Sequence, residues 1–222
     1  MISTLSRTVT RHLNKKHTAG RAAVVVAVAL ALSSCASAPP DLPPTIPSDR
    51  GETTVYIVRH AEKATNDPRD PDLSTKGFAR ADSLATQLRE AGINYIITTQ
   101  LKRTIQTAGP LARKRHITPE VVPVGTSTTI HVDSVVAAVK RRPGATILIV
   151  GHSNTIGPIA QALGGDKIGS VCDNEYSNLI VLSIPRAQRT RMLVQTYGLR
   201  DEPGDGTCKP LMGPGRKKAP SR

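Results

Sequence analysis

Two histidines follow strand-like runs of this chain, and each has neighbours suited to phosphoryl chemistry. Arg59 and His60 come directly after the apolar run 54–58, and His152 follows the run 147–150 after one glycine. Open α/β sheets build their ligand sites at the carboxyl ends of their strands. A neutral imidazole can attack phosphorus, and an arginine can bind two phosphoryl oxygens at once. The spacing therefore predicts one phosphoryl-handling pocket.

A third contribution to this pocket is expected from the segment after residues 94–98. Residues 98–108 read TTQLKRTIQTA, which is typical of a strand that leads into a helix. Arg103 would then lie about one turn inside the start of the helix, where the helix dipole favours anions. The candidate site residues are thus Arg59, His60, Arg103 and His152.

The elements that must position these residues alternate along the chain. Strand-like runs occur at 53–58, 94–98, 119–124, 146–150, 178–184 and 191–197. Helical patterns cover 74–91, 101–115, 132–141 and 155–163. This alternation predicts an α/β fold, a three-layer sandwich with a mainly parallel central sheet and helices on both faces. A short turn near 185–188 predicts that the last two strands form an antiparallel hairpin.

Charge and composition narrow the classes of ligand. The 222 residues carry a formal net charge of +13, and part of it lies at the amino terminus and in the tail. A basic surface suits phosphorylated ligands or anionic lipid, and a solvated surface with a basic tail is the alternative. Aromatic residues make up 2% of the chain, so the stacking side chains of nucleic-acid-binding surfaces are missing. We expect no nucleic-acid partner.

The amino terminus has the three parts of a secretory signal. A basic segment ends at Arg21, an apolar stretch of 11 residues covers 22–32, and the string Leu-Ser-Ser-Cys ends at Cys35. The apolar stretch is shorter than the roughly 20 residues that a membrane-spanning helix needs. The string resembles a bacterial lipobox, which implies cleavage before Cys35 and a diacylglyceryl group on its thiol. An ordinary signal peptide with a chance cysteine is the alternative.

The expected organisation has four segments. They are a lipoprotein signal peptide at 1–34, a proline-rich linker at 35–52, a folded domain at 53–200 and a basic tail rich in Gly and Pro at 201–222. Five prolines make the linker a stiff spacer that would hold the domain away from a membrane. We therefore expect an exported lipoprotein of the cell envelope, attached through the lipid on Cys35 and facing the periplasm or the cell exterior.

Two further cysteines remain once Cys35 is assigned to the lipid. In an oxidising compartment Cys172 and Cys208 could form a disulfide, and two separate thiols are the alternative. Such a bond would tie the tail to the domain, with a stabilisation on the order of 2–4 kcal/mol. A zinc site would need more ligands than this spacing offers, so we expect no metal.

Four motifs, in the right order and spacing over residues 53–197, resemble the histidine phosphatase superfamily with its phosphoglycerate-mutase-like fold. They are Val58-Arg59-His60-Ala61-Glu62-Lys63, Leu73-Ser74-Thr75-Lys76-Gly77, Arg103-Thr104-Ile105-Gln106-Thr107-Ala108 and Val150-Gly151-His152-Ser153-Asn154. The resemblance implies that His60 is the nucleophile and becomes a phosphohistidine. It implies that Arg59 and Arg103 clamp the phosphoryl oxygens and that His152 stabilises the transition state. It also implies that water completes the hydrolysis without a metal or organic cofactor.

The chain departs from the family pattern at the general acid. Ser153 stands where phytase-like members carry an Asp, and the stretch 106–146 offers only Glu120 and Asp133. Asp133 is the preferred candidate, because Glu120 begins a strand-like run, and Glu62 is a third option. A smaller departure is Ala61, which stands where many members have Gly. Compact members that act on phosphohistidine resemble this layout, and a phosphoramidate leaving group needs less help from an acid.

The expected function is therefore hydrolysis of phosphate monoesters or phosphohistidine through a covalent intermediate on His60. One rival is a phosphomutase, which would need a cap over the pocket to exclude water. The other is a non-catalytic lipoprotein that binds a phosphorylated ligand or an envelope partner. Substrate choice is expected to lie in loops such as 66–72 and 125–131, and the sequence leaves open whether the substrate is a small molecule or a phosphoprotein. His131 has no evident partner and is expected at the surface, and the oligomeric state is open.

Overall fold

The computed structural model describes residues 51–169 and 171–204, together with Cys208 and Leu211. The expected signal peptide, Cys35, nearly all of the linker and most of the tail lie outside the described residues. Within the part that the structure describes, no helix is long and apolar enough to cross a membrane.

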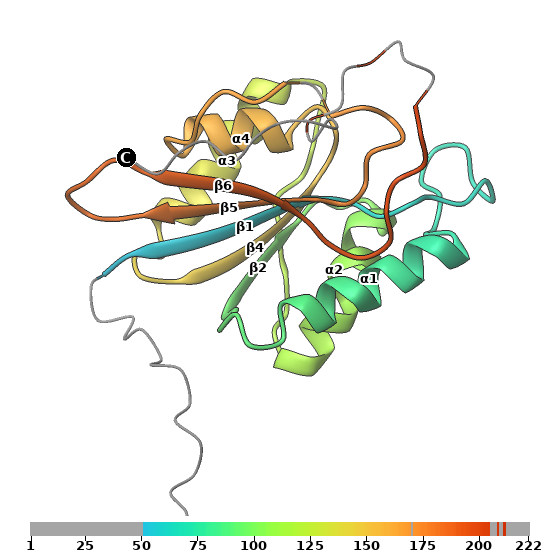
Figure 1. Cartoon of the computed structure of the whole chain (residues 1–222), viewed down its shortest axis with the longest axis horizontal. Helices are drawn as coiled ribbons and strands as arrows, with labels where there is room; N and C mark the ends of the chain where they lie inside the picture. The colour runs from blue at the N-terminus through green and yellow to red at the C-terminus, as the bar shows by residue number, and fades with distance from the viewer. Residues whose placement is uncertain (1–50, 170, 205–207, 209–210, 212–222) are drawn as a thin grey trace, which may run out of the picture. The chain divides into compact units, whose positions relative to one another are not determined.

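Strands and helices alternate through the described domain (Figure 1). The strands are β1 (Thr53–Arg59), β2 (Tyr95–Thr98), β3 (Glu120–Val121), β4 (Thr146–Gly151), β5 (Asn178–Ile184) and β6 (Arg191–Thr196). The helices are α1 (Thr75–Gln87), α2 (Lys102–Arg115), α3 (Thr128–Lys140) and α4 (Ile156–Ala162).

The strands form one sheet in the order β3-β2-β4-β1-β5-β6. The β1–β4, β2–β4 and β2–β3 pairs are parallel, whereas β5 is antiparallel to both β1 and β6. Figure 1 shows α1 and α2 on one face of the sheet and α3 and α4 on the other. The predicted three-layer α/β fold with an antiparallel hairpin at its end is confirmed.

Both faces of the central strands are buried, and side-chain alternation divides the core into two clusters. Val55 and Ile57 of β1 pack in the cluster that includes α3 and α4, whereas Val58 packs in the cluster that includes α1 and α2. In β4, Ile147 and Ile149 join the first cluster while their neighbours Leu148 and Val150 join the second. The two near-continuous apolar runs in the sequence therefore reflect strands covered by helices on both faces.

Element ends differ from the sequence prediction where local hydrogen bonds override the apolar pattern. Helix α3 begins at Thr128, four residues before the predicted start, because the Ser127 side chain accepts a hydrogen bond from the Ile130 N–H. The helix thereby takes in His131, which is buried and whose Nδ1–H donates to Pro123 O at 3.0 Å. The expectation that His131 lies at the surface is wrong, and the expected substrate loop 125–131 is shortened by the helix.

Candidate active site

The register of β1 and β4 brings the two histidine motifs side by side. Arg59 pairs with Gly151 across the two strands, and the His60 N–H donates to Gly151 O at 2.9 Å. The rings of His60 and His152 follow immediately, with centroids 5.4 Å apart. Adjacent parallel strands that end at the same level thus place both imidazoles at one edge of the sheet.

The ring of His60 is held in one orientation. Its Nδ1 lies 2.8 Å from Ala61 O, so Nδ1 carries the proton and donates to that carbonyl. The unprotonated Nε2 is then the nitrogen available for attack. The Ala61 N–H in turn donates to the Thr107 hydroxyl of α2 at 2.9 Å, which fixes the carbonyl that orients the ring.

The environment keeps this imidazole neutral. The residue is 5% exposed, and burial lowers the pKa of His60 from 6.5 to about 3. The hydrogen bond to Ala61 O opposes this shift, whereas the positive charges of Arg59 and Arg103 add to it. His60 therefore has an unprotonated ring nitrogen at neutral pH.

His152 is held by hydroxyl groups at the end of β2. Its Nε2 lies 3.2 Å from Thr99 Oγ1, which lies 3.0 Å from Thr104 Oγ1. When the Thr99 hydroxyl donates to Nε2, the ring proton of His152 resides on Nδ1 and can be donated to a phosphoryl oxygen. Burial, together with the charge of Arg103, lowers the pKa of His152 to about 4.

Arg59 is fixed by backbone carbonyls of the segment after α4. Its Nη1 donates to Cys172 O at 2.8 Å, to Asp173 O at 3.0 Å and to Glu175 O at 3.0 Å. The guanidinium carbon also lies 4.3 Å from the centre of the Tyr176 ring. The Nε atom is buried and has no hydrogen-bond acceptor among the described residues. The Nε–Nη2 edge of the guanidinium therefore retains donors for an oxyanion.

Arg103 enters from the other side of the site and is held less tightly. It is the second residue of α2, close to the predicted position, and its side chain is 18% exposed. Its Nη1 lies 3.7 Å from the Asp70 carboxylate, which also accepts a hydrogen bond from the Lys102 N–H at 3.0 Å. The Asp70 carboxylate thus caps the first N–H group of α2 and also restrains the Arg103 side chain.

The four predicted residues share one cavity of about 320 Å³. Its lining is predominantly polar and basic: Arg59, His60, Lys63, Leu101, Arg103, Val124, His152, Ser153, Asn154 and Asp173. Helix α4 is preceded by Thr155, whose hydroxyl accepts from the His152 N–H at 2.9 Å. Among the described residues, no group of three His, Cys, Asp or Glu side chains is arranged to hold a metal.

The three carboxylates proposed from sequence as the general acid are placed elsewhere. Asp133 is exposed on α3 and does not line the cavity, because the helix starts early and His131 and Val132 take its inward positions. Glu120 pairs with Arg141 and Arg142, both at the far end of α3.

Glu62 is committed to a structural ion pair. Its carboxylate accepts from Arg80, which is fully buried, at 2.8 Å and 3.0 Å. Arg80 also donates to Leu199 O and reaches Asp201, so this pair ties α1 to the end of the described chain. Gly77 lies at the start of α1 against Glu62, and a Cβ there would collide with the Glu62 carbonyl oxygen. The motif 73–77 therefore allows the start of α1 to pack closely against the backbone of Glu62.

Asp173 is the acidic residue that sequence reasoning missed. It is the one carboxylate in the lining of the cavity, its side chain is fully exposed, and it lies 3.8 Å from Arg59 Nη2. Its segment, 164–177, contains neither helix nor strand in the described residues, so no periodic pattern pointed to it. A disulfide joins the preceding residue, Cys172, to Cys208.

The comparisons with known proteins agree with this geometry. Residues 55–124 match the model of the histidine phosphatase superfamily (branch 1), a segment that contains most of β1, His60 and Arg103. Over these residues the chain is similar to the histidine phosphatase superfamily. The probable phosphoglycerate mutase GpmB of Escherichia coli O1:K1 is 40% identical over 65 residues, and that of Proteus mirabilis is 38% identical. Each match covers 27% of this chain and 30% of the relative, so the chain spans under a third of the length of these curated relatives.

Solved structures share the fold over a larger part of the chain. A mycobacterial glucosyl-3-phosphoglycerate phosphatase has a TM-score of 0.52 at 15% identity, with 66% of this chain and 100% of that chain covered. The protein histidine phosphatase SixA in complex with tungstate has a TM-score of 0.52 at 17% identity, with 64% and 96% covered. At these identities the likeness shows the fold alone.

Proposed function

We propose that this chain is a phosphatase that hydrolyses phosphate monoesters or phosphohistidine through a covalent intermediate on His60. The observation that carries the proposal is the convergence of a neutral, oriented imidazole with two guanidinium groups and a second histidine around one cavity. The proposal agrees with the match of residues 55–124 to the histidine phosphatase superfamily, and it goes further in naming the reaction.

The reaction would proceed in two displacements. His60 Nε2 attacks phosphorus, a nitrogen–phosphorus bond forms and the bond to the leaving group breaks. Arg59 and Arg103 bind the equatorial oxygens, where charge spreads in the transition state, and His152 donates a third hydrogen bond. Water then attacks the phosphohistidine, the nitrogen–phosphorus bond breaks, and inorganic phosphate leaves with the imidazole regenerated.

The first displacement also needs a proton for the leaving group. Asp173 is the carboxylate that lines the cavity, so it is our candidate proton donor in place of Asp133. Its side chain is fully exposed at the rim, and no buried carboxylate lines the cavity among the described residues. Leaving groups that need little protonation, such as the imidazole of phosphohistidine or a phenolate, are therefore the favoured substrates.

Hydrolysis is favoured over phosphoryl transfer to a second substrate because the site is open. The segment 61–74 and the segment 164–177 contain no helix in the described residues, so neither contributes a helical cap over the cavity. Asp173 at the rim is fully exposed, and water therefore reaches the phosphoenzyme. A mutase would have to keep that water away from the intermediate.

A chromogenic aryl phosphate in the presence of EDTA tests the proposal directly. The full chain should release phosphate, and the His60→Ala variant should lose at least about a thousandfold in kcat/KM. Quenching with alkaline denaturant should trap a phosphoenzyme in the wild type alone, and acid treatment should then release its phosphate. Equal rates for the two proteins would refute the covalent mechanism. Transfer of phosphate to an added acceptor in place of release would identify a mutase, and binding without turnover would identify a phospho-ligand-binding protein.

The proposal extends to export and anchoring, which rest on the sequence pattern at residues 1–35. A lipid on Cys35 would tether the domain to an envelope membrane. Metabolic labelling with a fatty acid should mark the wild-type chain, and Cys35→Ala should remove the label and move the protein out of the membrane fraction. Equal labelling of both proteins would contradict the assignment of the lipid to Cys35.

A further inference from the structure

The segment from Val171 to Ser177 has a structural role that the reaction steps above do not require. Three of its carbonyl groups, those of Cys172, Asp173 and Glu175, all accept hydrogen bonds from Arg59 Nη1. A guanidinium that donates to carbonyls keeps its position only while the carbonyls keep theirs. The anchoring of this segment therefore decides how well Arg59 is oriented.

The Glu175 carboxylate anchors the middle of the segment from within. It is buried, and its Oε2 accepts from the Cys172 N–H at 2.8 Å. Its Oε1 accepts from Asn178 Nδ2 at 3.1 Å and from the Leu211 N–H at 2.9 Å. One carboxylate thus joins the start of the segment, the start of β5 and a residue from the end of the chain.

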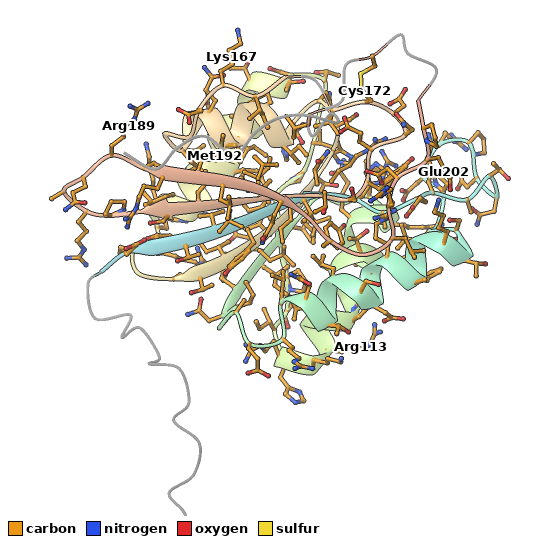
Figure 2. The ribbon with its side chains drawn as sticks, in the orientation of Figure 1. Arg113, Lys167, Cys172, Arg189, Met192 and Glu202 are labelled. Atoms are coloured by element: carbon orange, nitrogen blue, oxygen red, sulfur yellow. A yellow bond between two sulfur atoms is a disulfide. The ribbon has the colours of Figure 1, made fainter. Side chains whose placement is uncertain are left out.

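The disulfide anchors the same point covalently. Cys172 is bonded to Cys208, 36 residues further along the chain. Figure 2 shows Cys172 at the end of the sheet where the loop after β1 emerges, on the side of the site, whereas Arg189 of the β5–β6 turn lies at the opposite end. The carbonyl of Cys172 is the nearest acceptor of Arg59, so the disulfide lies one residue's backbone away from the guanidinium.

The far end of the segment has its own, independent anchor. The Asp201 carboxylate accepts from the Tyr176 and Ser177 N–H groups at 3.0 Å and 3.1 Å, and Arg80 holds Asp201 in turn. Loss of the disulfide would therefore leave the Cys172 end of the segment held by the Glu175 carboxylate alone, without releasing Tyr176.

We propose that the Cys172–Cys208 disulfide and the Glu175 carboxylate form a brace that positions Arg59, so that the affinity of the site for phosphoryl oxyanions depends on oxidation of this cysteine pair. The proposal rests on the proposed function in assigning Arg59 to oxyanion binding. Reduction by a dithiol would convert the disulfide to two thiols while the dithiol forms its own cyclic disulfide. The Cys172 carbonyl would then be held less firmly, by the Glu175 carboxylate alone, and one of the three hydrogen bonds that orient Arg59 would weaken.

Binding of tungstate, measured by calorimetry on the full chain, tests the brace without requiring turnover. We expect Cys208→Ser to weaken tungstate binding by roughly tenfold, the scale of one charge-assisted hydrogen bond. Cys35→Ser is the matched control, because it removes a cysteine and leaves the brace intact, and its affinity should equal that of the wild type. Glu175→Gln, which places a donor against the Cys172 N–H, should weaken binding to a similar extent.

A double-variant comparison separates positioning of Arg59 from general loosening of the fold. In an Arg59→Ala background, Cys208→Ser should weaken tungstate binding by less than about twofold, because its target is gone. In an Arg103→Ala background the full tenfold loss should persist. Equal losses in both backgrounds, or no loss in the wild-type background, would overturn the proposal.

Reduction of the folded wild type provides a second route if Cys208→Ser does not fold. Dithiothreitol should raise the inhibition constant of inorganic phosphate by roughly tenfold, and reoxidation should restore it. The Cys208→Ser variant, where it folds, should not respond to dithiothreitol. A wild type that binds tungstate in a disulfide-dependent way but turns over no phosphate substrate would refute the proposed phosphatase and leave the brace standing.

Discussion

The two arginines of the site are expected to bind the same phosphoryl group, yet the fold mounts them in different ways. Arg59 is 6% exposed and donates to three carbonyls, each within 3.0 Å. Arg103 is restrained by one carboxylate at 3.7 Å that is itself partly exposed. Neutral carbonyl acceptors on a fixed backbone orient a guanidinium without neutralising its positive charge. A solvated ion pair holds a guanidinium only loosely. One side of the site is preorganised and the other can adjust.

We expect the largest effects on kcat/KM and on stability when Arg59 or Arg103 is replaced by alanine. Arg59→Ala should lower kcat/KM by about a thousandfold or more and destabilise the fold by at least about 2 kcal/mol, since buried carbonyls lose their donor. Arg103→Ala should lower kcat/KM by about a hundredfold and change stability by less than about 0.5 kcal/mol. Aryl phosphate kinetics and urea denaturation measure both quantities. Equal losses of stability would show that the contacts of the two arginines contribute equally to the fold.

Asp173 extends the comparison to proton transfer, because it lies on the Arg59 side of the cavity. If it protonates the leaving group, Asp173→Asn should slow the hydrolysis of an alkyl phosphate by about a hundredfold and that of an aryl phosphate by much less. Asp133→Asn is the matched control, since that exposed carboxylate on α3 does not line the cavity and should leave both rates unchanged. An equal loss on both substrates would assign Asp173 to binding instead.

The pKa values of His60 and His152 should also respond differently to the loss of Arg59 and of Arg103. Arg59 contributes more than Arg103 to the lowered pKa of His60, whereas Arg103 contributes more than Arg59 to that of His152. In nuclear magnetic resonance titrations both rings should remain neutral as the pH is lowered to about 5. Arg59→Ala should raise the pKa of His60 more than that of His152, and Arg103→Ala should do the reverse. A uniform shift of both rings would contradict this pairing of charges.

The lowered pKa values also give stability a pH dependence of defined sign. Between pH 6.5 and about 4 the unfolded chain binds protons at these two histidines that the folded chain excludes. The free energy of unfolding should therefore fall as the pH falls through this range, by about 1.4 kcal/mol per unit and histidine, and these residues should contribute no slope above it. Urea denaturation of His60→Gln should show a shallower slope than the wild type.

The sequence predicts the parts of this site that are tied to periodic elements. Alternating burial in β1 and β4 makes both strands visible as apolar runs, and the histidines follow at their ends. Arg103 follows from the β2-to-α2 transition in the same way. The position of Asp133 could not be predicted in this way. It lies on the exposed face of α3, and the start of that helix depends on a single capping hydroxyl at Ser127.

The segment that supports Arg59 is harder to predict, and the reason is physical. Residues 164–177 have no repeating pattern, and their conformation is set by long-range contacts such as that between Glu175 and Leu211. Glu175 and Tyr176 belong to this stretch without a pattern, so nothing in the sequence points to them. Only the three-dimensional fold shows that their backbone and ring surround the guanidinium of Arg59.

The smallest expected effect comes from the carboxylate that restrains Arg103. The partly exposed Asp70–Arg103 pair is worth at most about 1 kcal/mol, so Asp70→Ala should raise KM by no more than about fivefold. Asp70→Asn should change it less, because the amide oxygen can still accept from the Lys102 N–H. Raising the salt concentration should shrink the difference between wild type and Asp70→Ala, since an exposed pair is screened.

The counterpart on the other side is Glu175→Gln, which acts on Arg59 through buried backbone. Its effect on KM should exceed that of Asp70→Ala and should not respond to salt, because buried interactions are screened little. Steady-state kinetics of the two variants at low and high ionic strength make the comparison. Similar, equally salt-sensitive effects would mean that both arginines are held by solvated charge, and that the carbonyl cradle around Arg59 adds no rigidity that the reaction uses.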